Sequence, residues 1–225
     1  DDANPAGNVH GGTTLKLMEE AGHIVATRHM SSSEAVKENG GNCLAALVRF
    51  EHMAFHEPSY VGEVSSCACE IIFTSRQSIL VEVVVTAEEF SKGRTRVTNT
   101  GWLWYVPVAP DPDGIEKEWK PVQVLPMTIP DVGLGLKKYE KAKAIYEKRK
   151  SSLQNSDEDC DDEAGGGAGF DEFKNEYTMP PDGRTPAESE QFLCQMVLPG
   201  DCSGSKVALG GFIMKIMDNA AGCSA

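Results

Sequence analysis

The opening motif of this chain occurs a second time near its end. Residues 1–12 read DDANPAGNVHGG, and residues 200–211 read GDCSGSKVALGG. At an offset of 199 positions the first aspartate, the paired glycines and several residues that follow them coincide. The matching pairs are Asp2 and Asp201, Gly11 and Gly210, Gly12 and Gly211, Lys16 and Lys215, Met18 and Met217, Glu19 and Asp218, and Ala21 and Ala220. An internal repeat of this kind predicts two halves of one architecture.

The first copy leads into a predicted helix over residues 11–29, followed by a predicted sheet. One helical face collects apolar and small residues at helical spacing: Leu15, Met18, Gly22, Val25 and Ala26. Because much of the remaining circumference is apolar too, we expect protein to surround most of this helix. Four strand-like runs follow at 43–55, 64–75, 78–90 and 95–108, and short turns join the last three as an antiparallel meander. A long helix beside such a sheet predicts an α+β layer arrangement.

Composition divides the rest of the chain. A highly charged helix is predicted over residues 135–154, and the stretch after it is acidic and rich in glycine, with too little apolar surface to order itself. We expect a first domain at 1–150, a linker at 151–188, and a second domain at 189–225 that begins with a strand at 190–203. The first copy lacks the strand that precedes the second, and the second stops within its helix, so both ends of the chain are expected to be cut.

Charge, cysteines and hydropathy exclude several classes of protein. The chain has 34 acidic and 21 basic residues, and its net charge of −13 would repel nucleic acid and anionic lipid. Its 7 cysteines lack the spacing of a zinc site or a disulfide framework, so we expect free thiols in a reducing compartment. No stretch approaches the ~20 apolar residues of a membrane span, and the polar start is no signal peptide. These features predict a cytosolic protein.

The motifs resemble those of a known family. The segments DDANPAGNVHGG, LKLMEEAG (15–22) and GWLWYVP (101–107) are similar to acyl-CoA thioesterases of the hotdog fold, in which an antiparallel sheet wraps a long central helix. Two linked copies resemble specifically the cytosolic double-hotdog acyl-CoA hydrolases of vertebrate brain type. The resemblance covers 1–150 as one nearly complete hotdog and 189–225 as the opening of a second, truncated copy.

Elementary chemistry explains why such a motif suits thioester hydrolysis. The N–H groups at Gly11 and Gly12, at the start of the helix, are free to polarise a thioester carbonyl and to hold the developing oxyanion. A carboxylate would supply the other half of the site, either by activating water or by attacking the carbonyl itself. A thioester is a reactive acyl donor, so no serine triad is needed.

The resemblance implies which side chains would act. In that family an asparagine before the glycine pair works with an acid on the helix of the facing hotdog, which here implies Asn4 with Asp218. The corresponding pair from the opposite halves, Ser203 with Glu19, would form a degenerate second site because the amide is lost. Such asymmetry is expected of a duplicated pair in which one site works.

The resemblance also implies the substrate and the assembly. It implies fatty acyl-CoA of medium to long chain length, no metal or redox cofactor, and a homo-oligomer built as a trimer of double hotdogs, that is, six hotdog domains. The family contacts CoA at the position of Arg76, which lies in a turn between Ser75 and Ser78. A second candidate for CoA binding is the basic helix at Lys137, Lys138 and Lys141.

Other interpretations are weaker. His52 and His56 lie four positions apart, but in a predicted strand they share no helical face, so a metal site is not expected. The main alternative function is a noncatalytic acyl-CoA or lipid-binding hotdog protein. A hotdog dehydratase is less favoured because no His–Asp pairing of that kind is evident.

Overall fold

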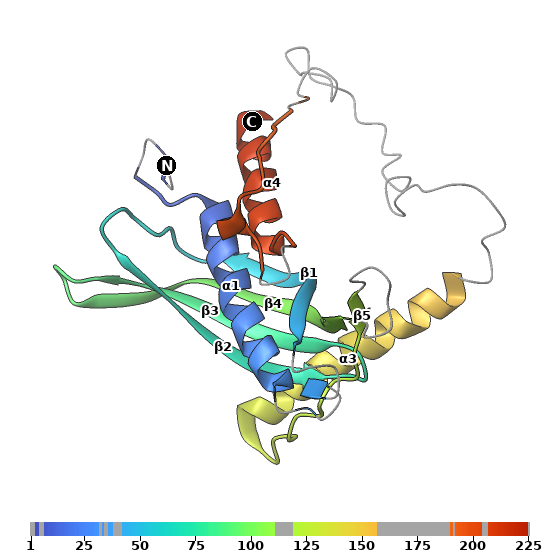
Figure 1. The fold of residues 1–225 in the computed structure, drawn as a ribbon. Coiled ribbons are helices and arrows are strands. Elements are labelled where there is room, and N and C mark those ends of the chain that lie inside the picture. The colour runs from blue at the N-terminus through green and yellow to red at the C-terminus, as the bar shows by residue number, and fades with distance from the viewer. Residues whose placement is uncertain are drawn as a thin grey trace, which may run out of the picture.

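A computed structural model describes residues 3–4, 7–31, 33, 36–37, 42–110, 119–156, 190, 192–203 and 207–224. Its central element is helix α1 (Gly11–Met30), which crosses one face of an antiparallel sheet (Figure 1). The predicted helix at 11–29 is confirmed. Ile24 and Arg28 are its exposed residues, and all others are at least partly buried. The expectation that protein surrounds most of this helix is therefore confirmed.

The four predicted strands are confirmed to within a few residues. They are β1 (Leu44–Phe55), β2 (Val64–Thr74), β3 (Ile79–Glu89) and β4 (Arg94–Pro110). Neighbouring strands are antiparallel in the order β1-β4-β3-β2, and the short strand β5 (Trp119–Pro121) pairs with β4. The expected meander of β2, β3 and β4 is present, and β1 joins it through β4.

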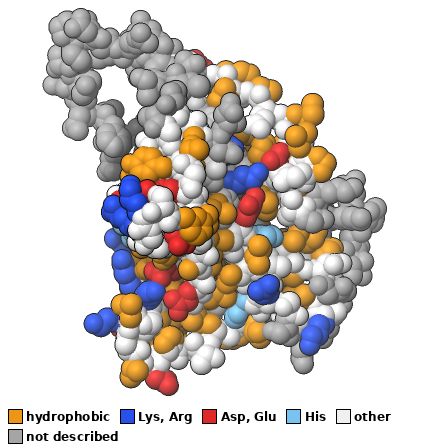
Figure 2. All heavy atoms as spheres, turned by 90° about the vertical axis from the view of Figure 1, so that its left-hand side faces the viewer, with side chains coloured by type: hydrophobic (Ala, Val, Ile, Leu, Met, Phe, Trp, Pro, Cys, Tyr) orange, Lys and Arg blue, Asp and Glu red, His pale blue; other side chains and the backbone are white. Residues whose placement is uncertain are grey.

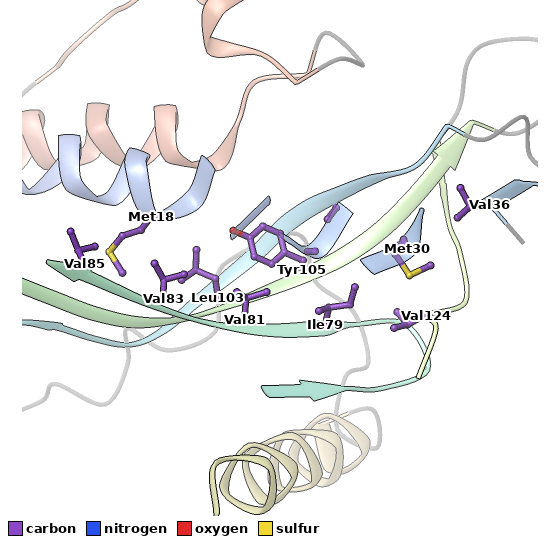
Figure 3. Packing of buried hydrophobic residues seen from close by; sticks show 12 residues of the cluster. Met18, Met30, Val36, Ile79, Val81, Val83, Val85, Leu103, Tyr105 and Val124 are labelled. Carbon is purple, nitrogen blue, oxygen red and sulfur yellow. The ribbon is translucent and has the colours of Figure 1, made fainter. Parts of the chain in front are cut away.

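The two faces of the sheet pack against different helices. Side chains alternate along a strand, so Ile79, Val81, Val83 and Val85 of β3 face α1 and form the main core with Met18, Leu103 and Tyr105 (Figure 3). Trp102, Trp104 and Leu80 belong to a second cluster. This second cluster covers the opposite face of the sheet, where helix α3 (Gly133–Ser156) lies.

Helix α3 packs on the sheet through an apolar stripe, and ion pairs flank this stripe. Tyr139, Ala142 and Tyr146 recur at helical spacing and pack on the second cluster, and Ala142 is fully buried. Lys138 pairs with Glu70 and Glu82. The ammonium of Lys141 lies 4.9 Å from the ring centroid of Trp102, so neither of these lysines projects freely towards a ligand.

The second copy of the motif differs from the prediction in one element. Its helix α4 (Gly210–Ser224) is present and lies beside α1 (Figure 1). The predicted strand at 190–203 was wrong: residues 192–198 have no regular secondary structure, and a 3₁₀ helix, η2 (Pro199–Asp201), follows. A strand needs a neighbour for its backbone groups, and residues 192–198 are exposed and pair with no described strand.

The proposed domain boundaries stay predictions. Helix α3 continues through residue 156, so the first six residues of the predicted linker at 151–188 are helical. The remainder of that linker lies outside the described residues. Figure 2 shows that hydrophobic side chains remain at the surface among acidic and basic ones, and on α4 the exposed examples include Ile213 and Met217.

Candidate active site

Helices α1 and α4 cross at closely packed glycines. A Cβ added to Gly12 would lie 2.7 Å from the Cα of Lys215, and one added to Gly211 would lie 2.8 Å from the Cα of Lys16. Both positions therefore require glycine for the two backbones to approach so closely. The two contacts are related by the offset of the repeat, so the duplicated motif forms a pseudo-symmetric helix pair.

Each helix start contacts an acid on the facing helix. The N–H of Gly12 donates to Oδ2 of Asp218 at 2.8 Å. In the same way, the backbone N–H of Gly211 hydrogen bonds to the Glu19 carboxyl group. The other oxygen of Asp218, Oδ1, lies 3.2 Å from the point where a Cβ of Gly11 would be.

This arrangement corrects one part of the sequence interpretation. We expected the N–H groups of Gly11 and Gly12 to face a substrate carbonyl together. The Gly12 N–H instead holds Asp218, because the close helix crossing brings that carboxylate directly onto it. The N–H of Gly11 donates to no acceptor among the described residues and can still serve a ligand.

The described ends of the loop before each glycine pair make the same backbone hydrogen bond in both copies. The N–H of Asn4 donates to the carbonyl of Asn8 at 2.8 Å, and the N–H of Ser203 donates to the carbonyl of Val207 at 2.8 Å. The Asn4 side chain adds an acceptor, Oδ1, for the N–H of Asn8 at 3.0 Å. Ser203 lacks this carboxamide, and its hydroxyl donates to the Val207 carbonyl at 3.3 Å instead. The two copies thus share this backbone hydrogen bond and differ in the side chain at its first residue.

A pocket of about 380 Å³ opens beside the first loop, and we call it the Asn4 pocket. It is lined by Asn4, Asn8, Val9, Gly11, Thr14, Phe55, His56, Glu57, Pro58, Ser59 and Asn99. Asn4 and Gly11 therefore share one pocket, and Gly11 in turn adjoins the carboxylate of Asp218. This arrangement is compatible with a catalytic pairing of Asn4 with Asp218, and that pairing stays a prediction.

A second pocket, of about 340 Å³, opens beside the second loop, and we call it the Glu19 pocket. It is lined by Glu19, His23, Leu44, Ala45, Ala46, Leu47, Val108, Trp119, Ser203, Val207, Ala208, Leu209 and Gly210. The structure thus brings together Glu19 and Ser203, the two residues of the expected degenerate site. Its walls are mostly apolar, to a greater extent than those of the Asn4 pocket, where more of the lining residues are polar.

Glu19 is buried far more deeply than the sequence indicated. On a helical wheel it lies at the border of the apolar face, but the side chain is only 1% exposed, and among the described residues its Oε2 has no hydrogen-bond partner. Burial raises the pKa of Glu19 to about 7, and Glu20 nearby contributes to the rise, whereas the hydrogen bond from Gly211 opposes it. The acid of the expected degenerate site is therefore partly protonated near neutral pH.

The two pockets lie at repeat-related positions, and each is lined by a different part of the repeated site. Four residues of the Asn4 pocket correspond, at the repeat offset, to four residues of the Glu19 pocket: Asn4 to Ser203, Asn8 to Val207, Val9 to Ala208 and Gly11 to Gly210. The Asn4 pocket adds residues from the sheet that follows its own loop, including Phe55 and Asn99. The Glu19 pocket adds residues from the facing half, namely Glu19, His23 and the start of β1. A complete site at either helix start would have both kinds of wall: residues of its own sheet and residues of the facing half.

Sequence reasoning missed the part of the Asn4 pocket that the sheet supplies. Asn99 and the segment 55–59 were not proposed as site residues, although Asn99 interrupts an otherwise apolar alternation on β4. A buried amide at a core-facing strand position was the available signal.

The expected CoA-binding turn lies apart from both pockets. Ser75 and Ser78 close the tight turn between β2 and β3, with their hydroxyl oxygens 2.7 Å apart. Arg76 uses its carbonyl to accept the N–H of Val124 at 2.9 Å. None of these three residues lines either pocket, so their role in CoA binding stays a prediction.

The two histidines considered for a metal site, His52 and His56, contact other side chains of the sheet. His52 packs edge-on against Trp102, and His56 hydrogen bonds to the Thr100 hydroxyl at 2.9 Å. No group of three or more metal-ligating side chains occurs among the described residues. Burial raises the pKa of the Cys43 and Cys67 thiols to about 11, so these free thiols are poor nucleophiles.

The fold and the paired helix starts are similar to those of one class of protein, the hotdog-fold thioesterases. Residues 6–92 match the model of the thioesterase superfamily. An acyl-CoA hydrolase from Bacillus cereus has a similar structure, with a TM-score of 0.52 at 25% identity, over 70% of this chain and 84% of that one. The predicted hotdog fold is confirmed, whereas the truncated second hotdog stays a prediction.

Curated relatives make the resemblance more specific. The chain is 36% identical over 225 residues to the human cytosolic acyl coenzyme A thioester hydrolase, and 35% identical over 222 residues to its mouse counterpart. Each match covers 99% of this chain and 52% of the relative, so the chain spans about half the length of the curated relatives it matches. The resemblance read from the motifs is confirmed.

Proposed function

We propose that this chain hydrolyses fatty acyl-CoA to a free fatty acid and CoA. One observation carries the proposal: the N–H of Gly12 in the first repeat holds the carboxylate of Asp218 in the second at 2.8 Å, beside a pocket that contains Asn4. An oriented carboxylate next to a free helix N–H and a carboxamide is the set of groups that thioester hydrolysis requires. The names of the curated relatives support the same substrate class.

In the proposed mechanism Asp218 acts as a general base. It removes a proton from water as the water oxygen adds to the thioester carbonyl, and the negative charge that develops on the carbonyl oxygen is stabilised by the Gly11 N–H and the Asn4 amide. The tetrahedral intermediate then expels CoA thiolate, which recovers the proton from Asp218. Direct attack by the carboxylate would form a mixed anhydride and expel CoA thiolate. Attack of water on the aspartyl carbonyl of that anhydride would then place one oxygen of Asp218 in the product after a single turnover in ¹⁸O-labelled water.

Location and assembly are proposals that rest on the same family. The relatives are named cytosolic, and the described cysteines are free thiols, which supports a cytosolic location. The proposed reaction itself calls for no metal or redox cofactor. No helix in the described ranges is long and apolar enough to cross a bilayer. Because each pocket shows only half of the repeated walls, we propose that the working unit pairs hotdogs into a homo-oligomer, a trimer of double hotdogs.

Replacing Asp218 tests the function directly. Asp218→Asn keeps an oxygen that accepts the Gly12 N–H but removes the base, so we expect thiol release from palmitoyl-CoA to fall by about 10²- to 10⁴-fold. The fall is measured with a thiol reagent across acyl-CoA lengths. Glu140→Gln, an exposed acid on α3, is the matched control and should retain full activity.

Two results would contradict this proposal. Unchanged hydrolysis in Asp218→Asn would remove the proposed base from the mechanism. Tight binding of palmitoyl-CoA by the unaltered protein without any release of thiol would favour the noncatalytic binding protein instead.

A further inference from the structure

An asparagine occupies a core-facing position at one end of the sheet. Asn99 on β4 lies opposite Val85 of β3 and Phe55 of β1, and it is only 3% exposed. The alternation of side chains from residue 99 to residue 105 places it on the same face as Leu103 and Tyr105, towards α1. Figure 3 shows Val85, its partner across the ladder, at the same end of this face as Met18. Its carboxamide thus lies where neighbouring strand positions carry core residues.

Asn99 lines the Asn4 pocket although only 3% of the residue is exposed. Its carboxamide is not a fully buried group that lacks a hydrogen-bond partner, because Glu19 Oε2 is the one such side-chain atom in the described ranges. A polar side chain in a pocket wall can hydrogen bond to a ligand that enters the pocket. Asn99 is therefore placed to contact what the Asn4 pocket binds.

The chemistry of the walls indicates which part of an acyl-CoA lies there. The half of the site seen in the Asn4 pocket carries polar groups, among them Asn8, Ser59 and Asn99. The half seen in the Glu19 pocket is mainly apolar, along Leu44 to Leu47. An acyl chain suits the apolar half. The pantetheine arm, which carries two secondary amides on the other side of the thioester, suits the polar half.

We propose that Asn99 binds a secondary amide of the pantetheine arm and so selects CoA thioesters over thioesters that lack this amide. A carboxamide donates and accepts at once, which matches the N–H and C=O of a secondary amide. The assignment rests on the proposed function for the identity of the substrate. Asn99 is a binding and specificity residue, separate from the carbonyl chemistry of Asp218.

Kinetics with three octanoyl thioesters test this role. Octanoyl-CoA has both amides, octanoyl-N-acetylcysteamine keeps one, and S-ethyl thiooctanoate has none. In Asn99→Leu we expect kcat/KM to fall by about 10- to 100-fold for octanoyl-CoA and to change by less than about twofold for the S-ethyl ester, since one buried hydrogen bond to substrate is lost. The substrate that keeps one amide shows whether the amide nearest the thioester is the one bound.

Controls separate binding from folding. Asn42→Asp, at an exposed asparagine, should leave all three rates unchanged. Asn99→Ala serves as the second variant if Asn99→Leu does not fold, which circular dichroism reports. Equal losses for the octanoyl-CoA and S-ethyl substrates would overturn the proposal, because they would indicate a structural or carbonyl role, and so would the absence of any loss.

A binding measurement distinguishes failure of this proposal from failure of the proposed function. Calorimetry with CoA and with pantetheine reports affinity without turnover, and we expect Asn99→Leu to weaken both by the same factor as kcat/KM. If the unaltered protein binds CoA but hydrolyses nothing, the proposed function fails and the affinity of Asn99→Leu still decides the role of Asn99. If the unaltered protein hydrolyses octanoyl-CoA but Asn99→Leu binds CoA equally well, only the assignment of Asn99 is overturned.

Discussion

At the scale of residues, the two acids at matching repeat positions have different surroundings. Asp218 is partly exposed and accepts a hydrogen bond from Gly12, whereas Glu19 is buried with one oxygen lacking a partner in the described chain. Burial disfavours a charge, so the pKa of Glu19 is raised and this residue is mainly a neutral acid at mildly acidic pH. The duplicated motif is thus asymmetric in its physics as well as in its sequence.

Glu19→Gln should stabilise the fold at alkaline pH. The pKa of Glu19 is raised from 4.5 to about 7, so the folded protein binds the proton more tightly than the unfolded chain does. The resulting stability is fully present below pH 4.5 and is lost as the pH rises through 7. Since glutamine mimics the neutral acid, we expect the variant to unfold at higher urea than the wild type at pH 8, by about 3 kcal/mol in the free energy of unfolding. The difference should vanish near pH 4.5.

The exposed Glu140→Gln variant provides the baseline for these urea titrations. It should show the pH dependence of the wild type. A Glu19→Gln variant whose advantage is the same at pH 5 and pH 8 would show that Glu19 does not titrate as described.

At the scale of elements, the helices on the two faces of the sheet have different roles. Helix α1 carries the glycine pair and packs against α4, so that face holds both pockets. Helix α3 covers the other face through aromatic contacts, including Tyr146 stacked on Trp104 with centroids 6.1 Å apart. Arg149 adds an ion pair with Glu51 at 2.5 Å. Detaching α3 should therefore expose tryptophan without dismantling the site.

Ala142→Glu should release α3 from the sheet. Ala142 is fully buried against the second cluster, and a carboxylate there would lose its hydration among aromatic and aliphatic side chains. We expect tryptophan fluorescence to shift to the red as Trp102 and Trp104 meet water, and the free energy of unfolding to fall by about 2–4 kcal/mol. Ala144→Glu, on the exposed side of the same helix, should change neither. Unchanged fluorescence in Ala142→Glu would contradict this docking.

At the scale of the whole molecule, the described sheet ends in two edge strands, β1 and β2. An edge strand offers unpaired backbone groups and invites association. On β1 the register shifts at Val48, whose apolar side chain is 58% exposed. A net charge of −13 opposes self-association through general repulsion, so contacts that hold copies together must be specific. The β1 edge is our candidate for such a contact.

Val48→Lys should lower the extent of self-association. A lysine on an edge strand adds charge and desolvation cost to any strand placed against it. Light scattering over a concentration series should give multiples of the single-chain mass for the wild type and a lower average mass for the variant. Val132→Lys replaces an even more exposed valine that lies just before α3 and should behave as the wild type does. Equal masses for the Val48→Lys variant and the wild type would exclude the β1 edge as an interface.

Much of the fold was predictable because its patterns are local. The alternation along β3 and the helical spacing in α1 report which side of each element is buried, so these elements matched to within a few residues. The strand expected at 190–203 failed because pairing depends on a neighbour, which the local pattern does not contain. Asn99 escaped notice because its importance arises from a pocket that α1 and the sheet form together.

The sequence by itself determined the duplication, the glycine pairs, and the exchange of an amide and an acid between the two copies, because these are properties of residue identity and spacing. Only the tertiary structure decided that Gly12 holds Asp218, that Glu19 is buried, and that Asn99 faces the Asn4 pocket. Burial and hydrogen bonding depend on which segments meet in space. These contacts bring together residues that are up to 206 positions apart, which no local sequence pattern can indicate.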